Sequence, residues 1–235
     1  MSTQIALVED NDVIRENYSE VFTDEGFDVV SFSNRHDASK YFQTTLPDVA
    51  ILDIGLNEER DAGFKLCSDL RHLSQTLPII FLTSRDEEFD RISGLRVGAD
   101  DYITKDIGIN YLIVRIEALF NRIQALTPSD DSENKTSGNR RAFGSLEFDS
   151  SRIIAFWKGE LLGLSLTQYW ILNELASNAG EVKDNSKLMR AAKICVEPNT
   201  ISAHIKTIRA QFRTLDADFN CIKTERGAGY RWVEV

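Results

Sequence analysis

The segment VAILDIG, residues 49–55, decides the fold, because it contains an apolar run that ends on a carboxylate, Asp53. An uninterrupted apolar run is typical of a strand covered on both faces, as in a parallel sheet. An Asp directly after a strand is most often a turn former or a helix cap, because its oxygens accept hydrogen bonds from nearby backbone N–H groups. Only the residues that lie near Asp53 in the fold can therefore show whether its role is structural or functional.

Four further apolar runs share this pattern, and each is followed by an amphipathic stretch. The runs are IALVE (5–9), FDVVSF (27–32), IIFLT (79–83) and DYIT (101–104), and the stretches with helical spacing fall within 13–26, 35–45, 63–73, 87–98 and 110–123. Five such pairs predict an α/β domain with a five-stranded, doubly wound (flavodoxin-like) parallel sheet. Sites in such sheets lie at the carboxyl ends of the strands.

The segment TPSDDSENKTSGNRR, residues 127–141, has few apolar residues and the composition of a flexible linker. It separates a first domain over residues 1–126 from a second over residues 142–235. The first carries 23 acidic and 12 basic side chains (net −11), and the second carries 11 and 12 (net +1). The acidity of the chain therefore belongs to the first domain and does not argue against contact of the second with nucleic acid.

The second domain begins with three β-rich runs, LEFD, RIIAFW and ELLGL, which predict an antiparallel meander. Ser165 and Gln168 have the spacing of a capping box at the start of a helix. Two further helical stretches follow, at about 184–193 and 198–213, and the chain closes with two β-rich runs around a Gly-containing turn. This order predicts an α+β winged-helix domain with an N-terminal antiparallel sheet.

Composition favours a cytoplasmic chain that does not contact membranes. No apolar stretch approaches the roughly 20 residues that span a bilayer, and the N-terminal residues lack the pattern of a signal peptide. The three cysteines, Cys67, Cys195 and Cys221, are far apart and have no histidine at metal-ligand spacing. They are expected to be reduced side chains in the core.

Polar residues stand at or directly after four of the predicted strands: Glu9 and Asp10, Asp53, Thr83, and Lys105. Each has an ordinary explanation alone, but parallel strands bring their carboxyl ends to one edge. Three clustered carboxylates repel one another unless a cation neutralises them, and carboxylate oxygens suit Mg²⁺. With Mg²⁺, an ammonium and a hydroxyl beside it, Asp53 is predicted to be the nucleophile of a phosphoryl transfer.

Residues 1–126 resemble the receiver domain of two-component response regulators, through ALVEDN, AILDIG, FLTSR and GADDYITK. The resemblance implies Asp53 as phosphoacceptor, with a phosphohistidine of a sensor histidine kinase as the donor. It implies a metal site made by Glu9, Asp10, Asp53 and the Gly55 carbonyl. It further implies Thr83 and Lys105 as phosphate contacts, and Tyr102 as an aromatic switch that moves with Thr83.

Two departures from the receiver pattern stand close to this site. Lys105 is followed by Asp106 where a proline is usual, so a trans bond is expected there, because a cis bond before a residue other than proline costs about 2.5–4 kcal/mol. The segment after Asp53 is about two residues longer than is common, lacks the usual proline, and carries Glu58, Glu59 and Asp61. We hypothesise that this loop slows phosphorylation or selects the partner kinase.

Residues 142–235 resemble the winged-helix effector domain of OmpR/PhoB-type regulators, through SLTQYWIL, NTISAHIKTIRAQF and TERGAGYRW. In the second of these segments Ile201, Ile205, Ile208 and Phe212 form an apolar stripe. Five residues are predicted to point outward to base edges in the major groove of double-stranded promoter DNA or to its phosphates: Asn199, Thr200, Ala203, Lys206 and Thr207.

The remaining DNA-binding predictions concern charge. Lys206, Arg209 and Arg226 are expected to reach phosphates or the minor groove, and His204, at the edge of the stripe, to pack or to contact a phosphate. Asn199 and Thr207 stand where arginines are common, so a monomer is expected to bind weakly, with a shallow salt dependence. Pairing on a repeated DNA site would then supply the affinity.

The resemblance also implies a homodimer on phosphorylation, with RNA polymerase as a further partner. The predicted dimer face carries Arg91, Asp101, Arg115 and Arg122 at matching positions, whereas Tyr111 replaces a common acidic residue. Phosphorylation would shift an existing equilibrium towards the dimer.

Two other functions remain open from the sequence. Aspartate-nucleophile phosphohydrolases also combine Asp, Mg²⁺, Thr and Lys, but they resemble a pattern with a second acid where Gly55 stands here. The sequence therefore favours a protein that is not an enzyme. An atypical regulator that binds DNA constitutively, with an unused acidic pocket, is the other alternative, and the Lys105–Asp106 pair supports it.

Overall fold

The computed structural model describes residues 2–57, 59–85, 87–106, 108–124, 140–150, 152–192 and 199–233. The chain forms two compact units, residues 1–117 and 118–235. The predicted linker falls almost wholly on residues 125–139, outside the described ranges. No helix among the described residues is both long and apolar enough to cross a membrane.

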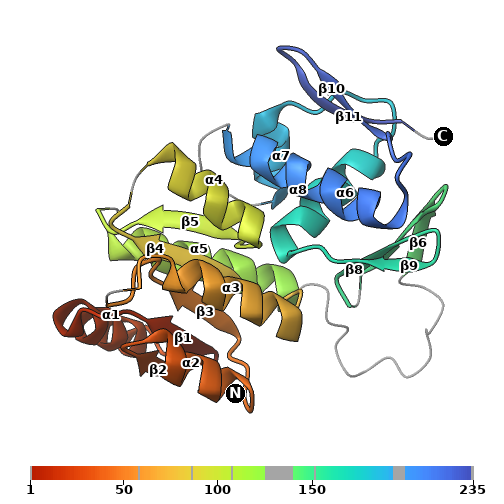
Figure 1. Ribbon diagram of the computed structural model, residues 1–235. Coiled ribbons are helices and arrows are strands. Elements are labelled where there is room, and N and C mark those ends of the chain that lie inside the picture. Colours follow the sequence, from red (N-terminus) through yellow and green to blue (C-terminus); the bar gives the residue numbers. More distant parts are fainter. Residues whose placement is uncertain are drawn as a thin grey trace. The chain divides into compact units, whose positions relative to one another are not determined.

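The first unit alternates strands and helices throughout (Figure 1). Its strands are β1 (Gln4–Val8), β2 (Asp28–Phe32), β3 (Val49–Leu52), β4 (Ile79–Thr83) and β5 (Asp101–Thr104), and its helices are α1 (Asp12–Asp24), α2 (Arg35–Phe42), α3 (Ala62–Leu73), α4 (Glu88–Val97) and α5 (Ile109–Gln124). The strands are parallel and lie in the order β2-β1-β3-β4-β5. This confirms the five-stranded doubly wound sheet.

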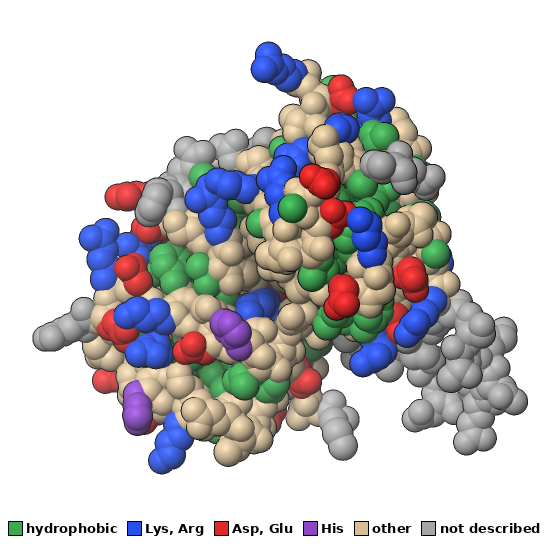
Figure 2. All heavy atoms as spheres, turned by 45° about the vertical axis from the view of Figure 1, so that its right-hand side comes forward, with side chains coloured by type: hydrophobic (Ala, Val, Ile, Leu, Met, Phe, Trp, Pro, Cys, Tyr) green, Lys and Arg blue, Asp and Glu red, His purple; other side chains and the backbone are tan. Residues whose placement is uncertain are grey.

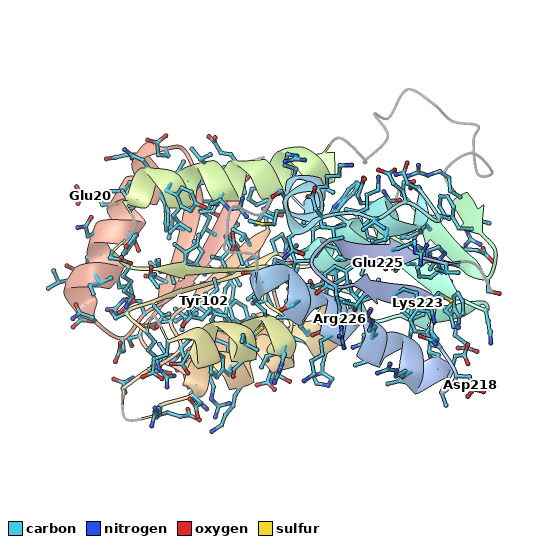
Figure 3. All side chains as sticks on the ribbon, turned by 90° about the horizontal axis from the view of Figure 1, so that it is seen from above. Glu20, Tyr102, Asp218, Lys223, Glu225 and Arg226 are labelled. Carbon is cyan, nitrogen blue, oxygen red and sulfur yellow. The ribbon has the colours of Figure 1, made fainter. Side chains whose placement is uncertain are left out.

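Both faces of this sheet are buried, which is why its strands are apolar without interruption. Along β3 every residue is buried, and alternate residues face opposite sides of the sheet. Ala50 and Leu52 pack in a cluster with Leu66 and Leu70 of α3. Figure 3 shows α4 and α5 on opposite sides of β5. The sheet is thus covered on both faces, so its polar residues gather at the strand ends.

The backbone after β3 is held closely against α3. Gly63 N–H donates to the Ile54 carbonyl at 2.8 Å, and a Cβ atom at Gly63 would lie 2.1 Å from the Asp53 carbonyl oxygen. Only glycine leaves room for this approach. Gly63 therefore fixes how the chain leaves β3 directly after Asp53.

The second unit begins with an antiparallel sheet and ends with a hairpin. The sheet contains β6 (Arg140–Phe143), β7 (Leu146–Asp149), β8 (Ile154–Trp157) and β9 (Glu160–Leu162), in that order. Three helices follow, α6 (Leu166–Ala176), α7 (Asn185–Ala192) and α8 (Asn199–Leu215), and then β10 (Ile222–Glu225) and β11 (Gly229–Trp232) pair antiparallel. Gln168 accepts a hydrogen bond from Ser165 N–H at 3.0 Å, as expected at the start of α6.

The first strand of this sheet differs from the prediction. The composition of residues 127–141 places Arg140 and Arg141 in the predicted linker, but both lie in β6, which pairs with β7. The strand is at the edge of the sheet and its two arginines are exposed. An edge strand with charged side chains has no hydrophobic pattern that sequence reasoning can detect.

We expect Gly63→Ala to destabilise the first unit by about 1–3 kcal/mol, because the new Cβ must displace the backbone after Asp53. Gly108→Ala is the matched control, since nothing lies within 4 Å of a Cβ at that position. Urea unfolding of both variants measures the difference. Equal unfolding free energies for the two variants would contradict the close approach at Gly63.

Candidate functional site

Three carboxylates meet at the carboxyl edge of the parallel sheet. Glu9 and Asp10 follow β1 and Asp53 follows β3, and one carboxylate oxygen of each lies within 4.8 Å of the others. Glu9 and Asp53 are buried. Asn11 caps α1 by accepting a hydrogen bond from Ile14 N–H at 3.1 Å, so Asp10 is not needed as a helix cap.

Lys105 reaches into this cluster from the end of β5. Its ammonium lies 2.6 Å from Asp53 Oδ2 and 2.6 Å from Glu9 Oε2. Its backbone N–H donates to the Thr83 carbonyl at 2.9 Å, which fixes the start of the loop after β5. The Lys105–Asp106 bond is trans, as expected from the missing proline, and Lys105 is nevertheless aimed at Asp53.

The negative charges of Glu9 and Asp53 are partly balanced by their contact with the positive charge of Lys105. Burial raises the pKa of the Glu9 carboxyl, and the hydrogen bond from Lys105 offsets only part of that rise. Burial alone would lower the pKa of the Lys105 ammonium, but its bonds to Asp53 and Glu9 outweigh burial and raise it. Lys105 is therefore the charged partner that allows two carboxylates to lie together.

Thr83 and Tyr102 both contact the main chain of Arg85. The Thr83 hydroxyl, 1% exposed, accepts a hydrogen bond from Arg85 N–H at 3.3 Å. The Tyr102 hydroxyl donates to the Arg85 carbonyl at 2.7 Å, and its ring packs beside Phe81. Figure 3 labels Tyr102 on β5. The two residues implied as a switch are thus connected through one residue of the loop between β4 and α4.

Two described acids of the loop between β3 and α3 are paired with basic side chains. Glu59 lies 2.7 Å from the Lys65 ammonium and 3.1 Å from the Arg35 guanidinium, and these bonds lower the pKa of its carboxyl. Asp61 lies 3.4 Å from Arg85. Glu58 lies outside the described residues. The sequence shows the acids of this loop, but not their partners, which come from α2, α3 and the loop between β4 and α4.

The donor set fits a hard divalent cation. The clustered ligand atoms are carboxylate oxygens, which Mg²⁺ prefers, and they carry more negative charge than Lys105 neutralises. Glu9, Asp10 and Asp53 would hold the ion. The predicted contribution of the Gly55 carbonyl stays a prediction.

Two residues of the predicted dimer face bond to each other within the chain. Asp101 Oδ2 accepts from Arg115 Nε at 2.8 Å and from Arg115 Nη2 at 2.5 Å. Both residues are buried. Tyr111 is half-buried on α5. The side chains of Arg91 and Arg122 lie outside the described part of the structure. The dimer face stays a prediction, and the sequence could not reveal that β5 and α5 bring two of its charged residues together.

In the second unit, α8 carries the expected apolar stripe. Ile201, Ile205, Ile208 and Phe212 are each at most 1% exposed. Lys206 is exposed, and the side chain of Asn199 lies outside the described residues.

The exposure of other α8 residues differs from the prediction. Thr200 and Ala203, predicted to point outward, are 2% and 4% exposed. Thr200 flanks the stripe in a helix of 3.6 residues per turn, so its polar character did not indicate an outward direction. His204 is fully buried, in line with packing, one of the two roles predicted for it. The Thr207 hydroxyl donates to the Ala203 carbonyl at 3.2 Å.

Arg209 also differs from the prediction, because it is bound to the hairpin. Its Nη2 donates to the Ile222 carbonyl at 2.9 Å and to the Thr224 hydroxyl at 2.8 Å, and its guanidinium lies 5.8 Å from the centre of the Tyr230 ring. Burial lowers the pKa of Arg209. Its contacts therefore make it a structural link between α8 and the hairpin.

Arg226 is exposed at the turn of the hairpin, where Figure 3 labels it with Lys223 and Glu225. The hairpin is anchored at Gly229, where a Cβ atom would lie 2.0 Å from the Lys183 carbonyl oxygen.

Figure 2 shows basic and acidic side chains interspersed over one face of the molecule. A modest electrostatic attraction for DNA agrees with the net charge of +1 over residues 142–235.

Comparison with family models assigns both units. Residues 5–117 match the response regulator receiver domain. Residues 159–232 match the C-terminal domain of transcriptional regulatory proteins.

Whole proteins with the same two domains are also similar. The chain is 32% identical to the transcriptional regulatory protein CreB of Escherichia coli over 95% of each chain. It is 29% identical to the alkaline phosphatase synthesis transcriptional regulatory protein PhoP of Bacillus subtilis, over 100% of this chain and 98% of that protein. Among solved structures, the response regulator DrrB of Thermotoga maritima, described as an OmpR/PhoB homolog, matches with a TM-score of 0.50 and 27% identity over all of both chains. A mutant of RitR shares the fold with a TM-score of 0.73 and 22% identity over all of both chains.

We expect Lys105→Gln to lower the free energy of unfolding of the metal-free protein by about 1–3 kcal/mol, because two buried carboxylates lose a shared donor. The loss is expected to be larger at pH 8 than at pH 5, since protonation of one carboxyl relieves the repulsion. Urea unfolding with a chelator present measures it. The exposed Lys40→Gln serves as control, and equal stability of the two variants would show that Lys105 does not balance this pocket.

Proposed function

The chain belongs to the OmpR/PhoB-type response regulators, transcriptional regulators of two-component systems that carry a DNA-binding domain, and on this premise we propose that Asp53 accepts a phosphoryl group from a sensor histidine kinase. The observation that carries the proposal is the bond of 2.6 Å between Lys105 and Asp53 inside a pocket of three carboxylates. The Asp53 carboxylate is thus buried, is oriented by its bond to Lys105, and has part of its negative charge balanced by that ammonium.

In the proposed step an Asp53 carboxylate oxygen attacks the phosphorus of a phosphohistidine. A phosphorus–oxygen bond forms, the phosphorus–nitrogen bond breaks, and the histidine nitrogen keeps the electron pair and takes up a proton. Lys105 would turn from Asp53 to an oxygen of the transferred group, and the Thr83 hydroxyl would donate to another. When bound, Mg²⁺ would neutralise charge on the carboxylates and the phosphoryl oxygens.

The hydroxyl of Thr83 supports a link between phosphorylation and conformation. It now accepts from Arg85 N–H, and Tyr102 donates to the carbonyl of the same residue. A phosphoryl group that recruits Thr83 would disturb both bonds and so bias the position of Tyr102. We infer that this shift favours a dimer, whose two DNA-binding units would bind adjacent half-sites and act on RNA polymerase.

The alternative of constitutive DNA binding with an unused pocket rested on the Lys105–Asp106 departure. Lys105 lies 2.6 Å from Asp53 despite that departure, which supports phosphorylation over an unused pocket. The phosphohydrolase alternative still lacks a general acid at Gly55. Phosphorylation-controlled regulation is therefore the function that the residues support best.

We expect the protein with Mg²⁺ and a small phosphodonor, such as phosphoramidate, to gain one phosphoryl group that is absent from Asp53→Asn. Mass spectrometry of the intact chain measures the modification. Light scattering of a parallel sample, with beryllofluoride as a stable substitute for the phosphoryl group, measures the dimer. Asp61→Asn is the control, because Asp61 pairs with Arg85 outside the carboxylate cluster. An unmodified wild-type chain that binds DNA equally with and without beryllofluoride would favour constitutive binding.

We expect Arg226→Ala to weaken binding to duplex DNA and to reduce the slope of log affinity against log salt by about 1. Arg209→Ala is expected to act differently, lowering the free energy of unfolding by about 1–3 kcal/mol because the Ile222 carbonyl loses its donor. Salt titration and urea unfolding separate the two effects. Arg152→Ala, which removes an exposed arginine between β7 and β8, is the control. A larger change of salt slope for Arg209 than for Arg226 would reverse these assignments.

A further inference from the structure

The lengthened loop after Asp53 contains a tight turn that lies against the carboxylate pocket. We call Leu56, Asn57 and Glu59 together the Asn57 turn. The backbones of Leu56 and Glu59 exchange two hydrogen bonds, of 3.2 and 3.1 Å, and Leu56 is buried. Asn57 has a φ of +56°, in the left-handed region that asparagine tolerates better than most residues.

Asn57 contacts one of the three carboxylates directly. Its backbone N–H donates to Asp10 Oδ2 at 2.7 Å. Its side-chain Nδ2 donates to the Ser33 carbonyl at 3.1 Å, which ties the turn to the segment that follows β2. A proline at this position could make neither bond, and its φ near −65° excludes the conformation that aims the N–H at Asp10.

The other end of the turn is held by two cations. Glu59 bonds to Arg35 of α2 at 3.1 Å and to Lys65 of α3 at 2.7 Å. The turn is therefore attached to Ser33, α2 and α3 at once, and its N–H cannot move freely away from Asp10. Asp10 is the least buried of the three carboxylates and has the most freedom to lose.

We propose that Asn57 is a positioning residue for the cation site: its backbone N–H fixes the orientation of the Asp10 carboxylate, and the Glu59 ion pairs hold Asn57 in place. The inference rests on the proposed function, because it assigns the support of the same site. A hydrogen bond to a ligating carboxylate orders it before the ion arrives, and loss of such partners typically reduces metal affinity by about 10–100-fold. The longer loop thus supports the pocket rather than obstructing it.

The test compares two substitutions of Asn57 in the full chain. Asn57→Pro removes the N–H and the left-handed conformation, and we expect its affinity for Mn²⁺ to fall at least about 10-fold. Asn57→Gly keeps both and loses only the bond to Ser33, so its affinity should stay within about threefold of wild type. Electron paramagnetic resonance of free Mn²⁺, with Mg²⁺ as competitor, measures binding without any phosphoryl transfer. Circular dichroism establishes that each variant is folded.

A second pair of variants decides the matter if Asn57→Pro does not fold. Glu59→Gln and Asp61→Asn each remove one negative charge from the same loop, but only Glu59 anchors the Asn57 turn. We expect Mn²⁺ binding to weaken more in Glu59→Gln than in Asp61→Asn. Equal affinities of this pair would mean that only the charge of the loop matters, and that result would overturn the proposal.

The outcomes separate this inference from the proposed function. Wild-type binding of Mn²⁺ that is unchanged in folded Asn57→Pro would overturn the role of Asn57 and leave phosphorylation of Asp53 untouched. A wild-type chain that binds neither Mn²⁺ nor beryllofluoride would overturn the proposed function itself, and the positioning role with it.

Discussion

The ammonium of Lys105, 2.6 Å from both Glu9 and Asp53, is the interaction on which the first unit's site depends. Two buried carboxylates at one sheet edge are unfavourable because each raises the energy of the other's charge. The fold cannot avoid their proximity, since parallel strands β1 and β3 are neighbours and both end there. The ammonium of Lys105, the residue directly after β5, lies between these carboxylates and makes their proximity compatible with a stable core.

The same constraint organises the surroundings of the pocket. Gly63 lets α3 approach the backbone of Asp53, and Asn11 supplies the helix cap that Asp10 could otherwise have become. Positive charges on α2 and α3 balance Glu59 of the lengthened loop. Although each of the three carboxylates accepts a backbone N–H bond, they still bring one oxygen each to within 4.8 Å of the others.

Much of this could be predicted from the sequence, because strand ends in a parallel sheet are determined by hydrophobic runs. Glu9, Asp10, Asp53 and Lys105 were identified by that rule, and the structure brings them together. Partners of long polar side chains could not be predicted in this way. Arg209 bonds to the hairpin and Arg115 to Asp101, and both pairings depend on how one element packs against the next in three dimensions. The role of Asn57 could not be predicted because it contributes a backbone N–H, which nearly every residue has. The only signal in the sequence is weak: asparagine tolerates a positive φ better than most residues.

The contacts of Arg85 have a consequence for how this protein can vary. Thr83 bonds to its N–H and Tyr102 to its carbonyl, so both bonds use atoms that every amino acid except proline possesses. The guanidinium, paired with Asp90 at 2.9 Å and with Asp61, is chemically independent of that connection. A substitution at this position can therefore change the attachment of the β3–α3 loop and of α4, while the backbone bonds that connect Thr83 and Tyr102 remain possible.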